Sequence, residues 1–218
     1  LRARFGVVEA EHMLLKNLRA AGFDEGDVDV VVLSHLHFDH AGGLLTPWSE
    51  AGESALCFPN AEFIVSAEAW ERACQPHPRD RASFIPQLQH LLEESGRLQI
   101  VQGTHAPSLG VDYRLHYSQG HTPGLMLTEI TGERGAVLFC GDLIPGAPWV
   151  HLPITMGYDR FPERLIDEKT ALLEELSRRD TALFFTHDAG IALGRFECDG
   201  RGRYGVTESV KQLSDYAL

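Results

Sequence analysis

The stretch SHLHFDHAGG (residues 34–43) places three histidines and an aspartate within six positions, as His35, His37, Asp39 and His40. It directly follows the apolar run VDVVVL (residues 28–33), which has the length and the β-branched composition of a buried strand. Imidazole and carboxylate groups are the side chains that bind zinc and related divalent metals. The stretch therefore predicts a metal site in the loop that follows a strand.

The composition is that of an ordinary globular protein. The 218 residues are 44% hydrophobic and 23% charged, which favours a single domain over residues 1–218. The net charge of −12 disfavours binding to nucleic acid and to anionic membranes, and no apolar run reaches the roughly 18 residues of a membrane span. The four cysteines form no CxxC pair, so we expect reduced thiols and a cytoplasmic protein.

Helical and strand-like segments alternate along the chain. Apolar residues recur at helical spacing in three segments, residues 9–22, 84–96 and 162–179. Short apolar runs, rich in β-branched and aromatic residues, occupy residues 29–34, 62–66, 98–101, 136–142 and 182–187. Residues 125–140 have the pattern of a hairpin with a Gly-containing turn. These patterns predict a layered α/β domain whose central strands are covered on both faces.

Further metal-binding side chains follow later strands. Asp142 and His187 end two of the apolar runs, and His121 follows the probable strand in YRLHYSQGHTPG (residues 113–124). Loops at the carboxyl ends of buried strands converge on one edge of an α/β sheet, so these side chains can meet the first stretch. Five imidazoles and two carboxylates exceed the needs of one tetrahedral ion and suit two divalent ions that share a carboxylate. We expect zinc, with iron and manganese as alternatives.

Four motifs carry a resemblance to a known family. HLHFDHAGG, GHTPG, CGD and FFTHD occur in this order and resemble the signature motifs of the metallo-β-lactamase fold superfamily of metal-dependent hydrolases, over roughly residues 10–190. The resemblance implies a four-layer αβ/βα sandwich of two mixed sheets with helices outside. The family has several strands before the first motif, so we expect these N-terminal strands to be missing here. The motif contexts are similar to the lactonase, organophosphate-hydrolase and glyoxalase-II-like branches.

The resemblance also implies a role for each ligand. The first ion would be bound by His35, His37 and His121, and the second by Asp39, His40 and His187. Asp142 would bridge the two ions. His37 stands where the redox flavodiiron branch has a glutamate. This difference argues against reduction of oxygen or nitric oxide.

The expected activity is hydrolysis of a small ester, lactone or related substrate. A hydroxide held between the two ions would attack the substrate, because coordination lowers the pKa of water to roughly 7. Asp142 would hold the ions together, and Asp39 or a metal-bound water would return the proton. The segment after Asp142 supplies the expected substrate contacts, Trp149, His151 and Tyr158.

Several alternatives remain open from the residues alone. A glyoxalase-II-like thioesterase shares the ligands, but the short stretch after His187 leaves little room for the helical domain of that family. A phosphotriesterase or phosphodiesterase would use the same centre. A purely metal-binding module is the least favoured reading, since structural zinc sites are normally closed by four protein ligands. A homo-oligomer is compatible with the sequence.

Overall fold

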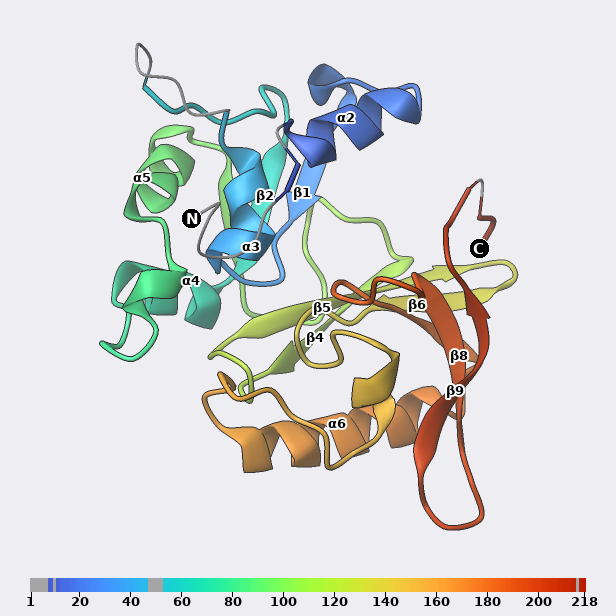
Figure 1. Ribbon diagram of the computed structural model, residues 1–218. Coiled ribbons are helices and arrows are strands. Elements are labelled where there is room, and N and C mark those ends of the chain that lie inside the picture. The colour runs from blue at the N-terminus through green and yellow to red at the C-terminus, as the bar shows by residue number, and fades with distance from the viewer. Residues whose placement is uncertain (1–7, 10, 47–52, 215) are drawn as a thin grey trace.

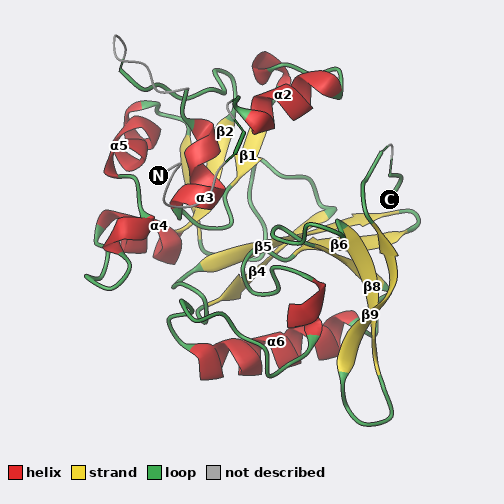
Figure 2. Ribbon diagram, in the orientation of Figure 1, coloured by secondary structure: helices red, strands yellow, loops and turns green. Residues whose placement is uncertain are grey.

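The computed structural model describes all residues except 1–7, 10, 47–52 and 215. The chain forms two β-sheets that pack against each other, and helices lie on the outer side of each sheet (Figure 1). The two sheets and their helices separate clearly when the elements are coloured by type (Figure 2).

The smaller sheet has three described strands, all parallel, in the order β1-β2-β3. These strands are β1 (Val30–Val32), β2 (Glu62–Ser66) and β3 (Leu98–Val101). The helices of this half are α2 (Met13–Ala20), α3 (Phe38–Ala41), α4 (Ala67–Cys74) and α5 (Pro86–Glu94). The short 3-10 turns of this half are η1 (Glu25–Asp27), η2 (Gly42–Leu44) and η3 (Arg81–Ser83).

The larger sheet has six strands in the order β4-β5-β6-β7-β8-β9. They are β4 (Tyr113–Ser118), β5 (Leu125–Gly132), β6 (Gly135–Phe139), β7 (Thr181–Phe184), β8 (Leu193–Cys198) and β9 (Tyr204–Val210). Only the β6–β7 pair is parallel among these strands. Parallel neighbours need a long crossover, and here it contains η4 (Ala147–Val150) and α6 (Pro162–Leu176).

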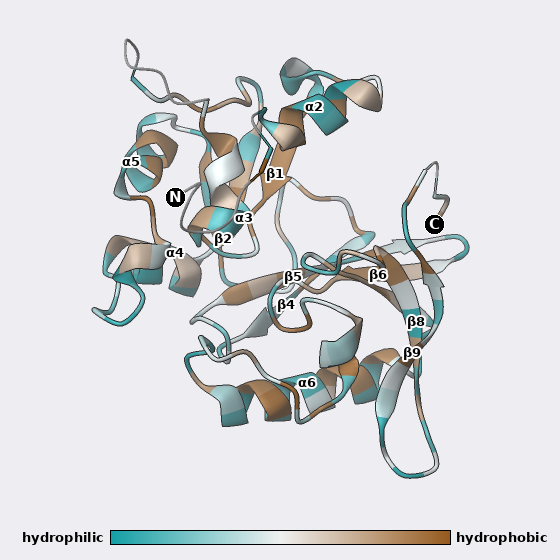
Figure 3. Ribbon diagram, in the orientation of Figure 1, coloured by the Kyte–Doolittle hydropathy of each residue, from teal (hydrophilic) through white to brown (hydrophobic). Residues whose placement is uncertain are grey.

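Alternating side chains along the central strands create the four layers. In β2, Phe63 and Val65 belong to the core beneath the helices, whereas Ile64 belongs to the core between the sheets. In β5, Met126 likewise belongs to the core between the sheets, while Leu127 belongs to the core that includes the leucines of α6. Hydrophobic segments run along β5 and β6, and hydrophobic and hydrophilic residues alternate along α6 (Figure 3). Each sheet is therefore buried on both faces at its centre.

The α/β sandwich with helices outside is confirmed, and the three predicted helices are α2, α5 and α6. The described strands of the smaller sheet are all parallel, and only the larger sheet mixes directions. The residues of β1 are only partly buried, because β1 has a neighbour on one side alone within the described chain. The sequence analysis expected the strands that precede the first motif in the family to be missing. This expectation concerns mainly residues 1–7, which lie outside the described residues.

Four of the described helices and strands were not predicted from the sequence, namely α3, α4, β8 and β9. All four cysteines have free thiols, as expected. Within the residues that the structure describes, no helix combines the length and the apolarity needed to cross a membrane.

Candidate metal centre

The seven predicted ligands lie at one edge of the sandwich, five in loops that follow strands and two on the short helix α3. His35 and His37 come soon after β1, and His37 is the residue before the first turn of α3, which carries Asp39 and His40. Asp142 and His187 follow β6 and β7, which are parallel neighbours and therefore end at the same edge. Gly141 turns the chain after β6 with a φ of 47°, a left-handed conformation that glycine adopts without strain.

Three histidines form the first cluster. His35 Nε2 lies 3.0 Å from His37 Nδ1, and His121 Nε2 lies 3.2 Å from the same atom. All three side chains belong to buried residues. Three ring nitrogens thus point at one another in a space that bulk water does not reach, which is the arrangement that a shared cation requires.

A second cluster lies beside the first and is more open to solvent. His187 Nε2 lies 3.2 Å from His40 Nε2, and Asp39 Oδ2 lies 3.6 Å from His40 Nε2 and 3.8 Å from His187 Nε2. The side chains of Asp39 and His187 are 41% and 39% exposed, whereas that of His40 is 8% exposed. A molecule in solution can therefore approach this cluster from the side of Asp39 and His187.

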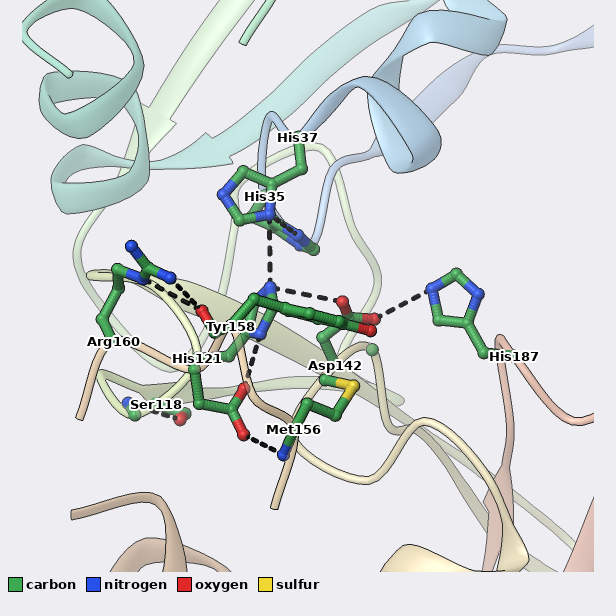
Figure 4. Close-up of polar contacts among 12 residues, drawn as sticks. His35, His37, Ser118, His121, Asp142, Met156, Tyr158, Arg160 and His187 are labelled. Atoms are coloured by element: carbon green, nitrogen blue, oxygen red, sulfur yellow. Dashed lines mark hydrogen bonds and ion pairs between the residues drawn. The ribbon is translucent and has the colours of Figure 1, made fainter. Parts of the chain in front are cut away.

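Asp142 lies between the two clusters and faces both (Figure 4). Its Oδ2 is 3.2 Å from His121 Nε2, on the side of the first cluster. Its Oδ1 is 3.1 Å from His40 Nε2 and 3.3 Å from His187 Nε2, on the side of the second. This Oδ1 is buried, and no described donor meets it in hydrogen-bond geometry. One carboxylate thus offers a separate oxygen to each cluster.

Burial keeps the imidazoles of His35 and His37 neutral. Desolvation, and then the charges of neighbouring histidines, hold the pKa of His35 well below its usual value and lower the pKa of His37 to about 3. A neutral ring has one nitrogen with a free lone pair, which is the form that binds a metal. Burial alone would raise the pKa of Asp142, but the ring nitrogens of His187 and His40 close to its Oδ1 outweigh this effect and lower that pKa, so the carboxylate stays ionised.

The donor set fits two divalent metal ions. Three groups of side chains each bring their ligand atoms within 4.8 Å of one another: His35 with His37 and His121, His35 with His40 and Asp142, and Asp39 with His40 and His187. The ring nitrogens face each other without enough protons to satisfy every contact, and Asp142 Oδ1 lacks a proper hydrogen-bond donor among the described residues. Cations between these atoms would satisfy both clusters.

Asp159 orients His121 and was missed by the sequence analysis. It is 4% exposed, and its Oδ1 lies 2.9 Å from His121 Nδ1. A carboxylate only accepts hydrogen bonds, so His121 donates from Nδ1 and turns the lone pair of Nε2 toward the cluster. The Oδ2 of Asp159 accepts a bond from the Met156 amide. Nothing in the segment GYDRF distinguishes this aspartate from a surface residue, because its partner is 38 positions away.

We predict that Asp159→Asn weakens metal binding by about 10- to 100-fold. The amide can present its NH2 group to Nδ1, which would favour the other tautomer and remove the lone pair from Nε2. Titration of metal-free protein against a competing chelator measures the affinity. The exposed Asp167 on α6 provides the matched control, and Asp167→Asn should leave the affinity unchanged. Equal affinities in the two variants would contradict the role of Asp159.

Helix α6 fixes the loop that carries His121. Glu168 accepts hydrogen bonds from the Ser118 hydroxyl at 2.6 Å and from the amides of Gln119 and Gly120 at 2.9 and 3.1 Å. Gly120 packs so closely on Leu165 that a Cβ atom would clash with the helix backbone. The position of His121 therefore depends on the seating of α6.

A cavity of about 400 Å³ opens beside the clusters. His37, Asp39, His121 and Asp142 form one side of it. The other lining residues come from the segment after α4 and from the loop before α6, and include Arg79, Asp80, Ser83, Tyr158 and Arg160. The metal centre is thus adjacent to a space large enough for a small organic molecule.

Of the predicted substrate contacts, only Tyr158 lines this cavity. Its side chain is exposed, and its ring centroid lies 5.9 Å from that of His121 (Figure 4). Trp149 packs against the core beneath the larger sheet, and the backbone carbonyl of His151 accepts a bond from the buried Lys169. Trp149 and His151 are placed in the fold beside the core rather than on the cavity wall.

Similarity to known proteins is consistent with this geometry. N-acyl homoserine lactonase AiiA of Bacillus thuringiensis subsp. kurstaki is 27% identical over 180 residues, which cover 82% of this chain and 63% of that protein. The chain thus spans less than two thirds of the length of that relative. A probable metal-dependent hydrolase from Staphylococcus aureus superposes with a TM-score of 0.79 at 24% identity, over 96% of this chain and 73% of its own.

A second solved structure, AidC, is described as a dizinc quorum-quenching lactonase. It superposes with a TM-score of 0.71 at 24% identity, over 94% of this chain and 71% of its own. At such identities these two structures establish a shared fold. The sequence itself matches the metallo-beta-lactamase superfamily over residues 6–187, a span that contains both clusters and Asp142. This chain belongs to the metallo-beta-lactamase superfamily.

Proposed function

We propose that the protein is a metal-dependent hydrolase of small esters or lactones, with two zinc ions as its cofactor. The observation that carries the proposal is the position of Asp142, whose two oxygens face two separate ligand clusters. The names of the relatives add support, since AiiA is an N-acyl homoserine lactonase and AidC is a dizinc lactonase. A lactone of this type is therefore the first substrate to test.

When bound, a pair of divalent ions activates water at neutral pH and polarises the carbonyl under attack. The residues of the chain prepare that chemistry. The neutral rings of His35 and His37 offer lone pairs, and the ionised Asp142 keeps the two clusters together. Asp39 stands at the exposed side of the second cluster, where its carboxylate can accept the proton that the attacking water releases and pass it to the leaving oxygen.

Tyr158 is proposed to orient the substrate. Its ring borders the cavity next to His121, and its phenol is protonated at neutral pH. Partial burial, and then the charges of Asp142 and Asp39, raise its pKa further. A phenol O–H can donate a hydrogen bond to a carbonyl oxygen of the substrate. Trp149 and His151 would affect substrates only through the loop that they help to form.

The test is a substrate panel on zinc-loaded protein. We expect hydrolysis of N-hexanoyl homoserine lactone, loss of turnover after chelation, and recovery when zinc is restored. Metal analysis should give about two ions per chain, as the two clusters require. Absence of metal-dependent hydrolysis of the lactone and of an aryl ester would overturn the proposal.

The same panel separates the alternatives. A thioester hydrolysed faster than the lactone would indicate a glyoxalase-II-like enzyme, and a preferred phosphotriester would indicate phosphoryl chemistry. A metal-binding module would bind zinc and hydrolyse none of the substrates. The exposed faces of Asp39 and His187 favour the enzyme, because structural zinc sites are closed to solvent ligands.

A further inference from the structure

Two arginines line the cavity beside the metal ligands. Arg79 lies in the segment between α4 and η3, and Arg160 lies in the loop that leads into α6. Both line the 400 Å³ cavity, together with His37 and Asp142 from the metal centre. The lining of the cavity thus combines metal ligands with two arginines.

The described carboxylates near these arginines form no ion pair with Arg79 or Arg160, although Asp80 Oδ1 is buried without a hydrogen-bond partner among the described residues. Asp80 Oδ2 accepts two bonds from Arg72, from Nε at 3.0 Å and from Nη2 at 2.8 Å. Asp159 is held by His121 and by the Met156 amide. Within the described chain, the Arg79 side chain forms no ion pair. Among the described residues, neither Arg79 nor Arg160 is therefore neutralised by a direct ion pair.

The geometry of Arg160 supports the same interpretation. Its Nε lies 3.0 Å from the Tyr158 carbonyl, and its Nη2 also donates to that oxygen, which fixes the guanidinium against the loop (Figure 4). Its Nη1 meets no acceptor among the described residues. An anion bound in the cavity would find both guanidinium groups along the same lining.

We propose that Arg79 and Arg160 bind a carboxylate that the substrate carries away from its reacting carbonyl. This inference rests on the proposed hydrolase function and narrows its substrate class to esters or lactones with an acidic side arm. A guanidinium forms paired, charge-assisted hydrogen bonds to a carboxylate, so it both binds and orients such an arm. The reacting carbonyl would then lie beside Asp142 and His121.

The test compares two γ-butyrolactones whose side arms have equal length, one ending in a carboxylate and the other in the neutral carboxamide. In the unaltered protein we expect kcat/KM to be about tenfold higher for the carboxylate, the worth of one charge-assisted bond. Raising the salt concentration from about 50 to about 500 mM should reduce this preference, because the wall is open to solvent. The zinc-loaded protein is used throughout.

Arginine variants locate the preference. Arg79→Gln should lower the ratio of the two kcat/KM values severalfold, mostly through KM of the carboxylate, with little effect on the carboxamide. Arg160→Gln should lower the same ratio, and Arg160→Lys should retain part of it. Arg81→Gln removes the same charge from the same segment, but Arg81 does not line the cavity, so the ratio should not change.

The outcomes distinguish this inference from the function on which it rests. Hydrolysis of both lactones at equal rates, or a ratio that survives both Arg79→Gln and Arg160→Gln, would overturn the carboxylate site and leave the hydrolase intact. If the zinc-loaded protein hydrolysed none of these substrates, neither the two γ-butyrolactones nor the aryl ester nor the homoserine lactone, the proposed hydrolase function itself would be overturned. Reading the ratio, rather than one rate, removes any general effect of a variant on folding.

Discussion

Asp142→Asn should abolish hydrolysis and reduce bound metal from about two ions per chain to about one. Asp142 presents Oδ2 to the cluster of His121 and Oδ1 to the cluster of His40 and His187. An amide can offer its oxygen to only one cluster, and its NH2 group repels a cation at the other. We expect kcat/KM to fall by about 10²- to 10³-fold or more, as when a catalytic charge-stabilising group is removed.

Metal analysis and lactone turnover on the same sample check this prediction. Asp167→Asn carries the same chemical change on an exposed position of α6 and should retain both the metal content and the rate. A variant that keeps two ions per chain and near-normal turnover would show that the two clusters do not depend on Asp142. The proposed dinuclear chemistry would then fail.

Lys169→Met should produce the largest loss of stability. Lys169 is fully buried on α6, and its Nζ donates to the carbonyl oxygens of Trp149 at 2.9 Å, His151 at 3.3 Å and Ile154 at 2.8 Å. Methionine matches the volume but leaves these buried carbonyls without their donor, at a cost of about 3 kcal/mol in the free energy of unfolding. For a chain of this size that corresponds to a decrease in Tm of roughly 6 to 12 °C.

Urea denaturation of the variant and the unaltered protein measures this cost. Lys16→Met on the exposed face of α2 is the matched control and should change the free energy of unfolding by less than about 0.5 kcal/mol. Proteolysis should also begin earlier in the segment around Ile154, since that loop loses its anchor. A variant as stable as the control would mean that Lys169 does not hold the loop.

The ligand positions could be predicted because residue type and position along the chain agree. His35, Asp142 and His187 each follow a strongly apolar strand, so both their chemistry and their meeting place are visible in the sequence. The burial of the central strands on both faces was predictable for the same reason, since the runs around β2 and β5 are apolar at consecutive positions. The four-layer arrangement was implied only by the resemblance to the family.

Supporting residues could not be recognised in this way. Asp159 and Lys169 are charged side chains in polar stretches, a pattern typical of solvent-exposed residues. Their burial depends on His121 and on carbonyl groups 15 or more positions away, which no local pattern encodes. Strands β8 and β9 were missed because residues such as Arg195 and Glu208 interrupt their apolar pattern, and because β9 is largely exposed.

Adjacent residues of one helix, Glu168 and Lys169, fasten the two chain segments that hold His121 and Asp159. Metal binding and thermal stability therefore both depend on the crossover between β6 and β7 that contains α6. Substitutions of the buried leucines of α6, which are not metal ligands, should consequently weaken zinc binding before they reduce the helical content of the protein. Because of the same linkage, substitutions selected for higher metal affinity should also stabilise the half of the sandwich that is built on the larger sheet.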